Sequence, residues 1–249
     1  MMTVPPESDV LVVPYGDRRL RCDVRRTAER NRNRVAIHVD PDGRILVDAP
    51  QRATDAEIRL ALTKRARWVQ NRLQEIDDSR RHVLPREYIS GESVYYLGRR
   101  YQLKVLSIQD SPAVRLHGGY LIVAIGSRDP ADVRVALHNW YRARAKRALQ
   151  MRLEVVCARL PWIKQPPPTS LRLMKARWGS CSPTGRLTLN PDLVRAPREC
   201  IDYVIAHELC HLKVHDHSPN FYRLLEANVP NWKEVKSRLD RMAEAILAT

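Results

Sequence analysis

The chain has 249 residues, of which 44% are hydrophobic and 29% charged, with a formal net charge of +15. Such a composition is typical of a folded globular protein and excludes a disordered one. No run approaches the roughly 18 apolar residues of a membrane span, so we expect no membrane partner. The amino terminus lacks the regions of a signal peptide, and the five cysteines form no C-x-x-C pair. These features predict a cytoplasmic protein without a disulfide framework.

The positive charge is unevenly placed along the chain. From residue 198 onward there are 7 basic and 8 acidic residues, which leaves a net charge of +16 for residues 1–197. Eight arginines fall between Arg18 and Arg34. A surface of this kind attracts polyanions, so the basic amino-terminal part predicts nucleic acid or another polyanion as one partner. The alternative is a solvated basic face that binds nothing specific.

The first part of the chain predicts a sheet followed by a helix. Residues 10–13, 20–24, 35–39 and 44–48 are short apolar runs, and residues 40–43 (DPDG) form a turn signal between the last two. We expect an antiparallel sheet with the arginines on its open face. Thr54 and Glu57 make a capping box, which opens a helix that keeps its apolar spacing to about residue 77.

The remainder predicts two hairpins and several helices. The hairpins turn at residues 97–100 and 117–120, and Asp129-Pro130 begins a helix that reaches about residue 159. Residues 170–178 and 186–190 are candidate strands, and residues 219–228 and 231–247 are candidate helices. The predicted fold class is α+β, with a basic β-sheet plus helix region (1–80), a region of hairpins and a long helix (93–160), and a catalytic region (161–249).

The pattern H-E-x-x-H occurs at His207, Glu208 and His211, in a segment whose Pro197 suits the first turn of a helix. Residues four apart share a helix face, so the two imidazoles can hold one metal ion while Glu208 points at a metal-bound water. The alternative is a core helix that carries histidines by chance.

The apolar pattern of this helix favours the metal. Its buried stripe consists of Ile201, Val204, Ile205, Leu209 and Leu212, which leaves Glu199, Asp202, Ala206, Cys210 and Lys213 for solvent. The two histidines flank that stripe, and Glu208 sits within its edge. Such polar groups are costly on a buried side unless they are paired, and a metal ion supplies the pairing.

A catalytic zinc needs a third protein ligand, and His215 and His217 are the two candidates. On a continuing helix, His215 would lie about 12 Å along the axis from His207, too far to share one ion. Ser218-Pro219 reads as a helix start, so the chain turns near Asp216 and His217 can fold back. We therefore favour His217 and keep His215 as the alternative. Glu226 is a further candidate if His217 fails.

Four segments together resemble the YgjP-like metallopeptidase family, which is related to the SprT-like and WLM zinc peptidases. These segments are residues 176–182 (ARWGSCS), Leu189-Asn190, residues 203–212 (YVIAHELCHL) and residues 217–221 (HSPNF). The resemblance implies a small zincin-like catalytic domain that binds Zn²⁺. It also implies His207, His211 and His217 as metal ligands, and Glu208 as the catalytic residue.

The expected function is hydrolysis of a peptide or protein substrate, with Glu208 as general base toward a zinc-activated water. The extended segment 170–178 could present an edge strand to the substrate. Arg177, Tyr222 and His215 are candidates for stabilising the developing oxyanion. Cys181 is interpreted as a packed small residue, with a thiol that blocks the zinc as the alternative. Two alternatives remain. One is a nucleotide pyrophosphatase, an activity linked to the family, and the other is a nucleic-acid-associated protein with a structural zinc.

Overall fold

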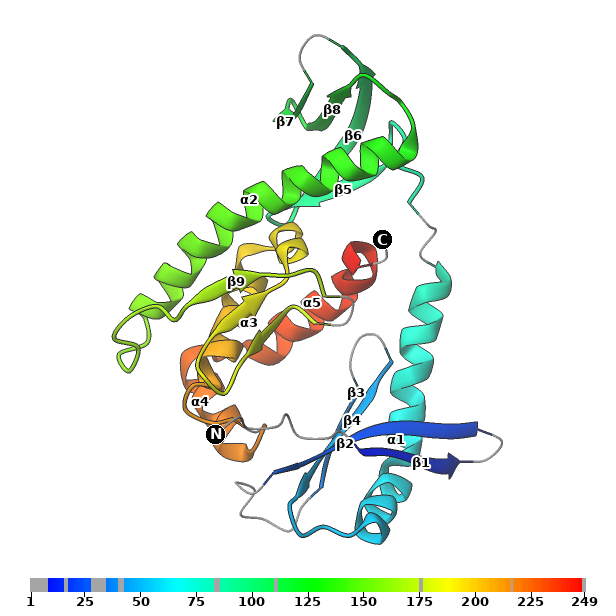
Figure 1. Ribbon diagram of the computed structural model, residues 1–249, viewed down its shortest axis with the longest axis vertical. Coiled ribbons are helices and arrows are strands. Elements are labelled where there is room, and N and C mark those ends of the chain that lie inside the picture. The colour runs from blue at the N-terminus through cyan, green and yellow to red at the C-terminus, as the bar shows by residue number, and fades with distance from the viewer. Residues whose placement is uncertain are drawn as a thin grey trace, which may run out of the picture. The chain divides into compact units, whose positions relative to one another are not determined.

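The computed structural model (Figure 1) describes residues 9–15, 18–27, 35–39, 43–82, 86–109, 112–174, 177–215 and 217–247. These residues form five α-helices and three sheets, which confirms the α+β class. The chain divides into two compact units, Met1–Val83 and Leu84–Thr249. Within the described ranges, no helix combines the length and the apolar character that crossing a membrane requires.

The first unit is a four-stranded sheet with one helix, and all four predicted strands are present. Its elements are β1 (Asp9–Tyr15), β2 (Arg18–Thr27), β3 (Ala36–Val39), β4 (Ile45–Pro50) and α1 (Asp55–His82). The expectation of an antiparallel sheet is wrong for one pair, because β2 and β4 are parallel in the order β1-β2-β4-β3. Strand β4 lies between β2 and β3, and β3 pairs antiparallel with the edge of β4 that β2 leaves open. Residues 40–42 of the predicted turn lie outside the described residues.

The alternation along β2 divides its two faces as predicted. Leu20, Cys22 and Val24 are buried, whereas the side chains of Arg19, Arg21 and Arg25 are exposed. The capping box is also confirmed, because the Glu57 carboxylate accepts from the Thr54 amide at 2.8 Å while the Glu57 amide donates to the Thr54 hydroxyl at 3.3 Å. Helix α1 continues past the predicted end near residue 77 to His82.

The second unit begins with the two predicted hairpins and the long helix. The hairpin strands are β5 (Ser93–Tyr96), β6 (Arg99–Ser107), β7 (Ala113–His117) and β8 (Tyr120–Ile125), in the order β5-β6-β8-β7. Helix α2 (Pro130–Ala158) starts with its predicted cap, since the Asp129 carboxylate accepts from the Ala131 amide at 2.7 Å. In Figure 1 the hairpin sheet lies at the amino-terminal end of α2.

The turn of the first hairpin packs on the segment that leads into the candidate metal helix. The amides of Leu97 and Gly98 donate to the carbonyls of Val194 and Arg195 at 2.8 and 3.1 Å. A Cβ on Gly98 would lie 2.8 Å from Cα of Pro197, and the φ of +78° at Gly98 also favours glycine. The hairpins, α2 and the region after residue 161 therefore share one hydrophobic core.

A small three-stranded sheet follows α2, and the sequence predicted it only in part. Its strands are β9 (Thr169–Leu171), β10 (Gly179–Cys181) and β11 (Leu187–Leu189), in the order β10-β11-β9. The predicted strand 170–178 is therefore too long. Strand β10 lies between the two predicted strands, where its glycine and serine carry little strand signal. The 3₁₀ helix η1 (Pro191–Arg195), capped by the Asn190 side chain, was also not predicted.

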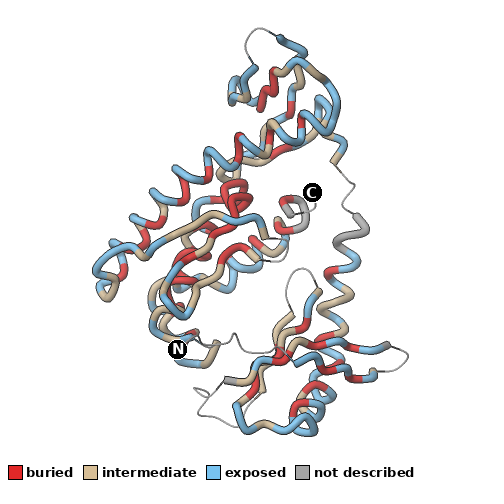
Figure 2. The backbone as a smooth tube through the Cα atoms, viewed as in Figure 1, coloured by how far each residue is buried: buried red, intermediate tan, exposed pale blue. Residues whose placement is uncertain are grey.

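Three helices complete the unit, namely α3 (Arg198–Cys210), α4 (Pro219–Asn228) and α5 (Trp232–Leu247). Helix α3 contacts α2, α4, α5 and β10. Its predicted solvent face is therefore wrong in part, since Ala206 and Cys210 are fully or almost fully buried. Figure 2 shows buried and exposed residues alternating along α2, the pattern expected of a helix with one face on a core.

Candidate metal centre

The last turn of α3 presents His207 and His211 on one face. Pro197 is the N-cap of this helix, and His211 is its C-cap residue. The two imidazole rings are 5.1 Å apart between centroids, as expected for neighbours separated by one turn. Both side chains are half-buried.

His217 returns to these two histidines after the chain leaves α3. Helix α4 begins at Pro219 with Ser218 as its N-cap, at the predicted position, and Asp216 lies outside the described residues. The Nε2 atoms of His217 and His207 are 3.1 Å apart, and the His217 ring centroid is 4.7 Å from that of His211. One nitrogen from each of the three residues lies within 4.8 Å of the others.

The other sequence candidates for a third ligand do not join this cluster. His215 is exposed and contributes no nitrogen to it, although it lies only two residues before His217. Glu226 on α4 is exposed as well, and its carboxylate is not among the clustered atoms. Of the candidates, the fold brings only His217 to the pair on α3.

The ring of Phe221 supports all three imidazoles from one side. Phe221 is completely buried on the first turn of α4, and its ring stacks on that of His211 at 4.5 Å between centroids. Its centroid is 4.9 Å from that of His207 and 4.8 Å from that of His217. His211 Nδ1 is 3.1 Å from the carbonyl oxygen of Val214, so a proton on Nδ1 donates to that oxygen and leaves the lone pair of Nε2 to bind a metal.

Glu208 follows His207 on α3 and is buried, with 7% of its surface exposed. Burial raises the pKa of its carboxyl to about 8, because the charged form loses hydration. Two contacts act in the other direction, namely the positive charge of Arg177 and a hydrogen bond from the Cys181 amide. The pKa of this carboxyl therefore lies close to neutral pH in the metal-free protein, so a small change in its surroundings changes its charge.

Strand β10 fixes the position of that carboxylate. A Cβ on Gly179 would lie 2.7 Å from Cγ of Glu208 and 2.9 Å from its Oε1. The Cys181 thiol is half-buried, and burial together with the Glu208 charge raises its pKa to about 11. The thiol is thus neutral at ordinary pH, which agrees with its interpretation as a packing residue.

The donor set fits a zinc ion. Imidazole nitrogens bound to zinc at about 2.0–2.1 Å in tetrahedral geometry are about 3.3 Å apart, and the His207–His217 separation of 3.1 Å is close to that spacing. Three neutral nitrogens leave a fourth position for water, and the buried Glu208 directly follows His207 in the chain. This is the ligand pattern of catalytic rather than structural zinc sites.

Sequence reasoning missed three contributors to this site. These are the backbone of β10 at Gly179, the Val214 carbonyl and the Phe221 ring. Phe221 is the one phenylalanine of the chain and lies four residues after His217, which could have drawn attention to it. The position of a backbone carbonyl, or the close approach of a glycine backbone to a side chain, carries no sequence signal of this kind.

Comparison with known proteins identifies the family of the chain. A model of the YgjP-like metallopeptidase domain matches residues 33–242, so the chain belongs to the YgjP-like metallopeptidase family. The chain is also similar to the crystal structure of the metallopeptidase zymogen of Pyrococcus abyssi, abylysin. Their sequence identity is 26%, covering 38% of this chain and 90% of that one, with a TM-score of 0.31. No curated protein matches significantly.

Proposed function

We propose that the protein is a zinc-dependent metallopeptidase whose metal ligands are His207, His211 and His217. The observation that carries this proposal is the convergence of three imidazole nitrogens within 4.8 Å beside a buried glutamate. A zinc ion held there would polarise the substrate carbonyl and lower the pKa of a water molecule to about 7. The family membership supports the same class of reaction.

Glu208 is the general base in this proposal. Its carboxylate accepts a proton from the attacking water and later delivers that proton to the nitrogen of the leaving amine. In the metal-free site burial raises the pKa of this carboxyl to about 8, and the positive charge of a bound zinc would favour the carboxylate form that accepts the proton. The Cys181 amide and the Gly179 backbone orient the carboxylate for these transfers.

Strand β10 is the proposed binding edge for the substrate. It is the outermost strand of the order β10-β11-β9, and it packs on α3. The Ser182 amide donates to the Arg186 carbonyl and the Trp178 carbonyl accepts from the Asn190 amide, at the two ends of β11. The backbone groups of Gly179 and Cys181 therefore point to the opposite edge, where the Cys181 amide already donates to Glu208 and the other groups are left for a substrate. A peptide that paired with that edge would pass directly beside Glu208.

Arg177 is the favoured candidate for stabilising negative charge on the substrate. Its charge already acts on the Glu208 carboxylate, so it lies near the reacting groups. Tyr222 is a second candidate, since its ring centroid is 6.3 Å from that of His217. His215 has the weakest position of the three, because it is exposed and outside the cluster.

The test compares the wild type with Glu208→Gln, which keeps the shape of the side chain but cannot accept the proton. Both proteins are loaded with zinc and screened against a peptide library and a set of nucleoside triphosphates. We expect the wild type to cleave peptides and the variant to lose at least about 10²-fold in kcat with its zinc retained. Cleavage of nucleotides but not peptides, or full turnover by the variant, would contradict the proposal.

A further inference from the structure

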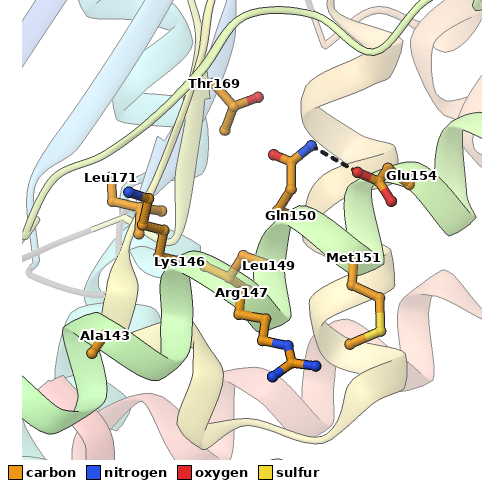
Figure 3. Close-up of a pocket in the computed structure, with 9 residues that line it drawn as sticks. All are labelled: Ala143, Lys146, Arg147, Leu149, Gln150, Met151, Glu154, Thr169 and Leu171. Atoms are coloured by element: carbon orange, nitrogen blue, oxygen red, sulfur yellow. Dashed lines mark hydrogen bonds between the residues drawn. The ribbon is translucent and has the colours of Figure 1, made fainter.

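A second candidate site lies between α2 and β9, and none of its lining residues belongs to the candidate metal centre. It is a cavity of about 690 Å³ lined on the helix side by Lys146, Arg147, Gln150 and Glu154, and on the strand side by Thr169 and Leu171. Figure 3 shows the Gln150 side chain pointing from α2 to the side where Thr169 lies. The proposed metallopeptidase reaction makes no use of any of these residues.

The strand side of this cavity is a sheet edge. Strand β9 pairs in parallel with β11 and with no other strand of the described residues. The Pro168 carbonyl accepts from the Leu187 amide, and the Arg172 amide donates to the Leu189 carbonyl. Because backbone groups alternate along a strand, the N–H and C=O groups of Thr169 and Leu171 point away from β11. These two residues also line the cavity, so it can offer four backbone groups for pairing.

The helix side of the cavity carries more positive than negative charge. Lys146 and Arg147 are exposed, and no described carboxylate forms an ion pair with either of them. Glu154 supplies the one negative charge of the lining, and its carboxylate accepts from Gln150 Nε2 at 3.0 Å. Leu171 and the exposed Met151 add apolar surface.

We propose that this cavity is an exosite for an extended acidic peptide segment, which adds to the free edge of β9 as a further strand. The backbone groups of Thr169 and Leu171 pair with the segment, and Lys146 and Arg147 attract its carboxylates. The exosite is distinct from the proposed substrate edge, because β11 separates β9 from β10. Two strand spacings place the two edges about 10 Å apart across the sheet.

A peptide fits this cavity better than a nucleic acid does. A nucleic acid would place phosphates against the Glu154 carboxylate and would leave the donors and acceptors of the strand edge without regular partners. An extended peptide satisfies both N–H and C=O groups in alternation, and its side chains can avoid Glu154 by their spacing. Nucleic acid binding is accordingly the outcome that opposes the proposal.

The experiment measures binding to the full-length Glu208→Gln protein, so that no probe is cleaved. The probe is a fluorescent octapeptide of alternating valine and glutamate, titrated by anisotropy at low and high salt. Three comparison probes are an alternating valine–lysine octapeptide, the acidic sequence N-methylated at every residue, and a single-stranded oligonucleotide. We expect the acidic octapeptide to bind, and the other three to bind at least about tenfold more weakly.

Variants locate the binding on α2 and β9. Lys146→Glu and Arg147→Glu should each weaken binding of the acidic probe about tenfold, whereas Arg134→Glu, on the same helix outside the cavity, should change it less than twofold. Thr169→Pro removes an outward N–H and should also weaken binding, with circular dichroism as the check on folding. The proposal would be overturned if the acidic probe does not bind at concentrations up to about 1 mM, or if the N-methylated probe binds equally well. It would also be overturned if the oligonucleotide binds more tightly, or if neither charge reversal changes the affinity for the acidic probe.

Discussion

The backbone of Gly179 lies so close to the side chain of Glu208 that no other residue fits there without displacement. A Cβ at position 179 would be 2.7 Å from Cγ of Glu208 and 3.1 Å from its Cδ. The glycine therefore has a positional role, because it lets a strand approach a buried carboxylate and deliver the Cys181 amide to it. The geometry of the general base thus depends on a residue with no side chain.

The first prediction is that Gly179→Ala lowers activity while zinc stays bound. The added methyl must push Glu208 aside, and a displaced base costs kcat more than KM, by about 10²-fold. Steady-state kinetics and zinc analysis measure the two effects. Gly126→Ala is the matched control, since its Cβ would come no nearer than 4.0 Å to the Gln109 side chain. Equal kcat in Gly179→Ala and wild type would show that the close contact has no catalytic role.

The second prediction concerns the pH dependence of stability in the chelator-treated protein. Burial raises the Glu208 pKa to about 8 from an ordinary value of 4.5. A raised pKa means that the folded state binds the proton more tightly than the unfolded state does. The stability that this proton contributes is full at low pH and is lost as pH rises to about 8. The stability of Glu208→Gln relative to the wild type should therefore increase with pH, by up to about 1.4 kcal/mol per pH unit between about 5 and 8. Urea unfolding of both proteins at several pH values measures this difference, and a constant difference would contradict the assigned burial.

The third prediction concerns the buried ion pair of Asp192 and Arg195. The two groups are 3.1 Å apart and almost completely buried, and Arg195 Nη1 donates to the Ile246 carbonyl at 3.0 Å. Arg195→Met leaves the carboxylate without its charge partner and should lower the free energy of unfolding by about 3–5 kcal/mol. Arg238→Ala, which breaks an exposed pair with Glu199, should cost at most about 1 kcal/mol. Comparable losses in the two variants on urea unfolding would contradict the distinction.

Much of the fold follows from local patterns in the sequence. The capping box at Thr54, the Asp129-Pro130 helix start and both hairpin turns carry their own chemistry, so their positions were predictable. The parallel pairing of β2 with β4 was not, because it depends on which edge of β4 the strand β3 occupies. Strand β10 was not predictable for a similar reason. Its pairing with β11 and its contact with Glu208 hold it in place, whereas its own residues have little strand propensity.

The candidate site was more predictable than the sheets around it. The spacing of His207 and His211 on one helix needs no tertiary information. The Ser218-Pro219 helix start predicts that the chain folds back at His217, and α4 begins there. The orientation of each ring was not predictable, because the Phe221 ring and the Val214 carbonyl that contact the imidazoles come from other segments.

The fourth prediction distinguishes His217 from His215. His217→Ala should weaken zinc retention at least about 10²-fold, because one of three protein ligands is lost. His215→Ala is the matched control two residues away, and it should retain the metal with wild-type affinity since its side chain is exposed. Competition of each variant against a graded series of chelators gives both affinities. Loss of zinc in His215→Ala but not in His217→Ala would reverse the assignment.

The central claim is that three histidine nitrogens hold one zinc ion beside Glu208. Zinc X-ray absorption on the purified full-length protein, with elemental analysis of the same sample, tests it most directly. We predict about one zinc per chain, with three imidazole nitrogens at about 2.0–2.1 Å and one further oxygen ligand. Protein that holds no zinc after reconstitution, or zinc in a site dominated by sulfur, would contradict the claim.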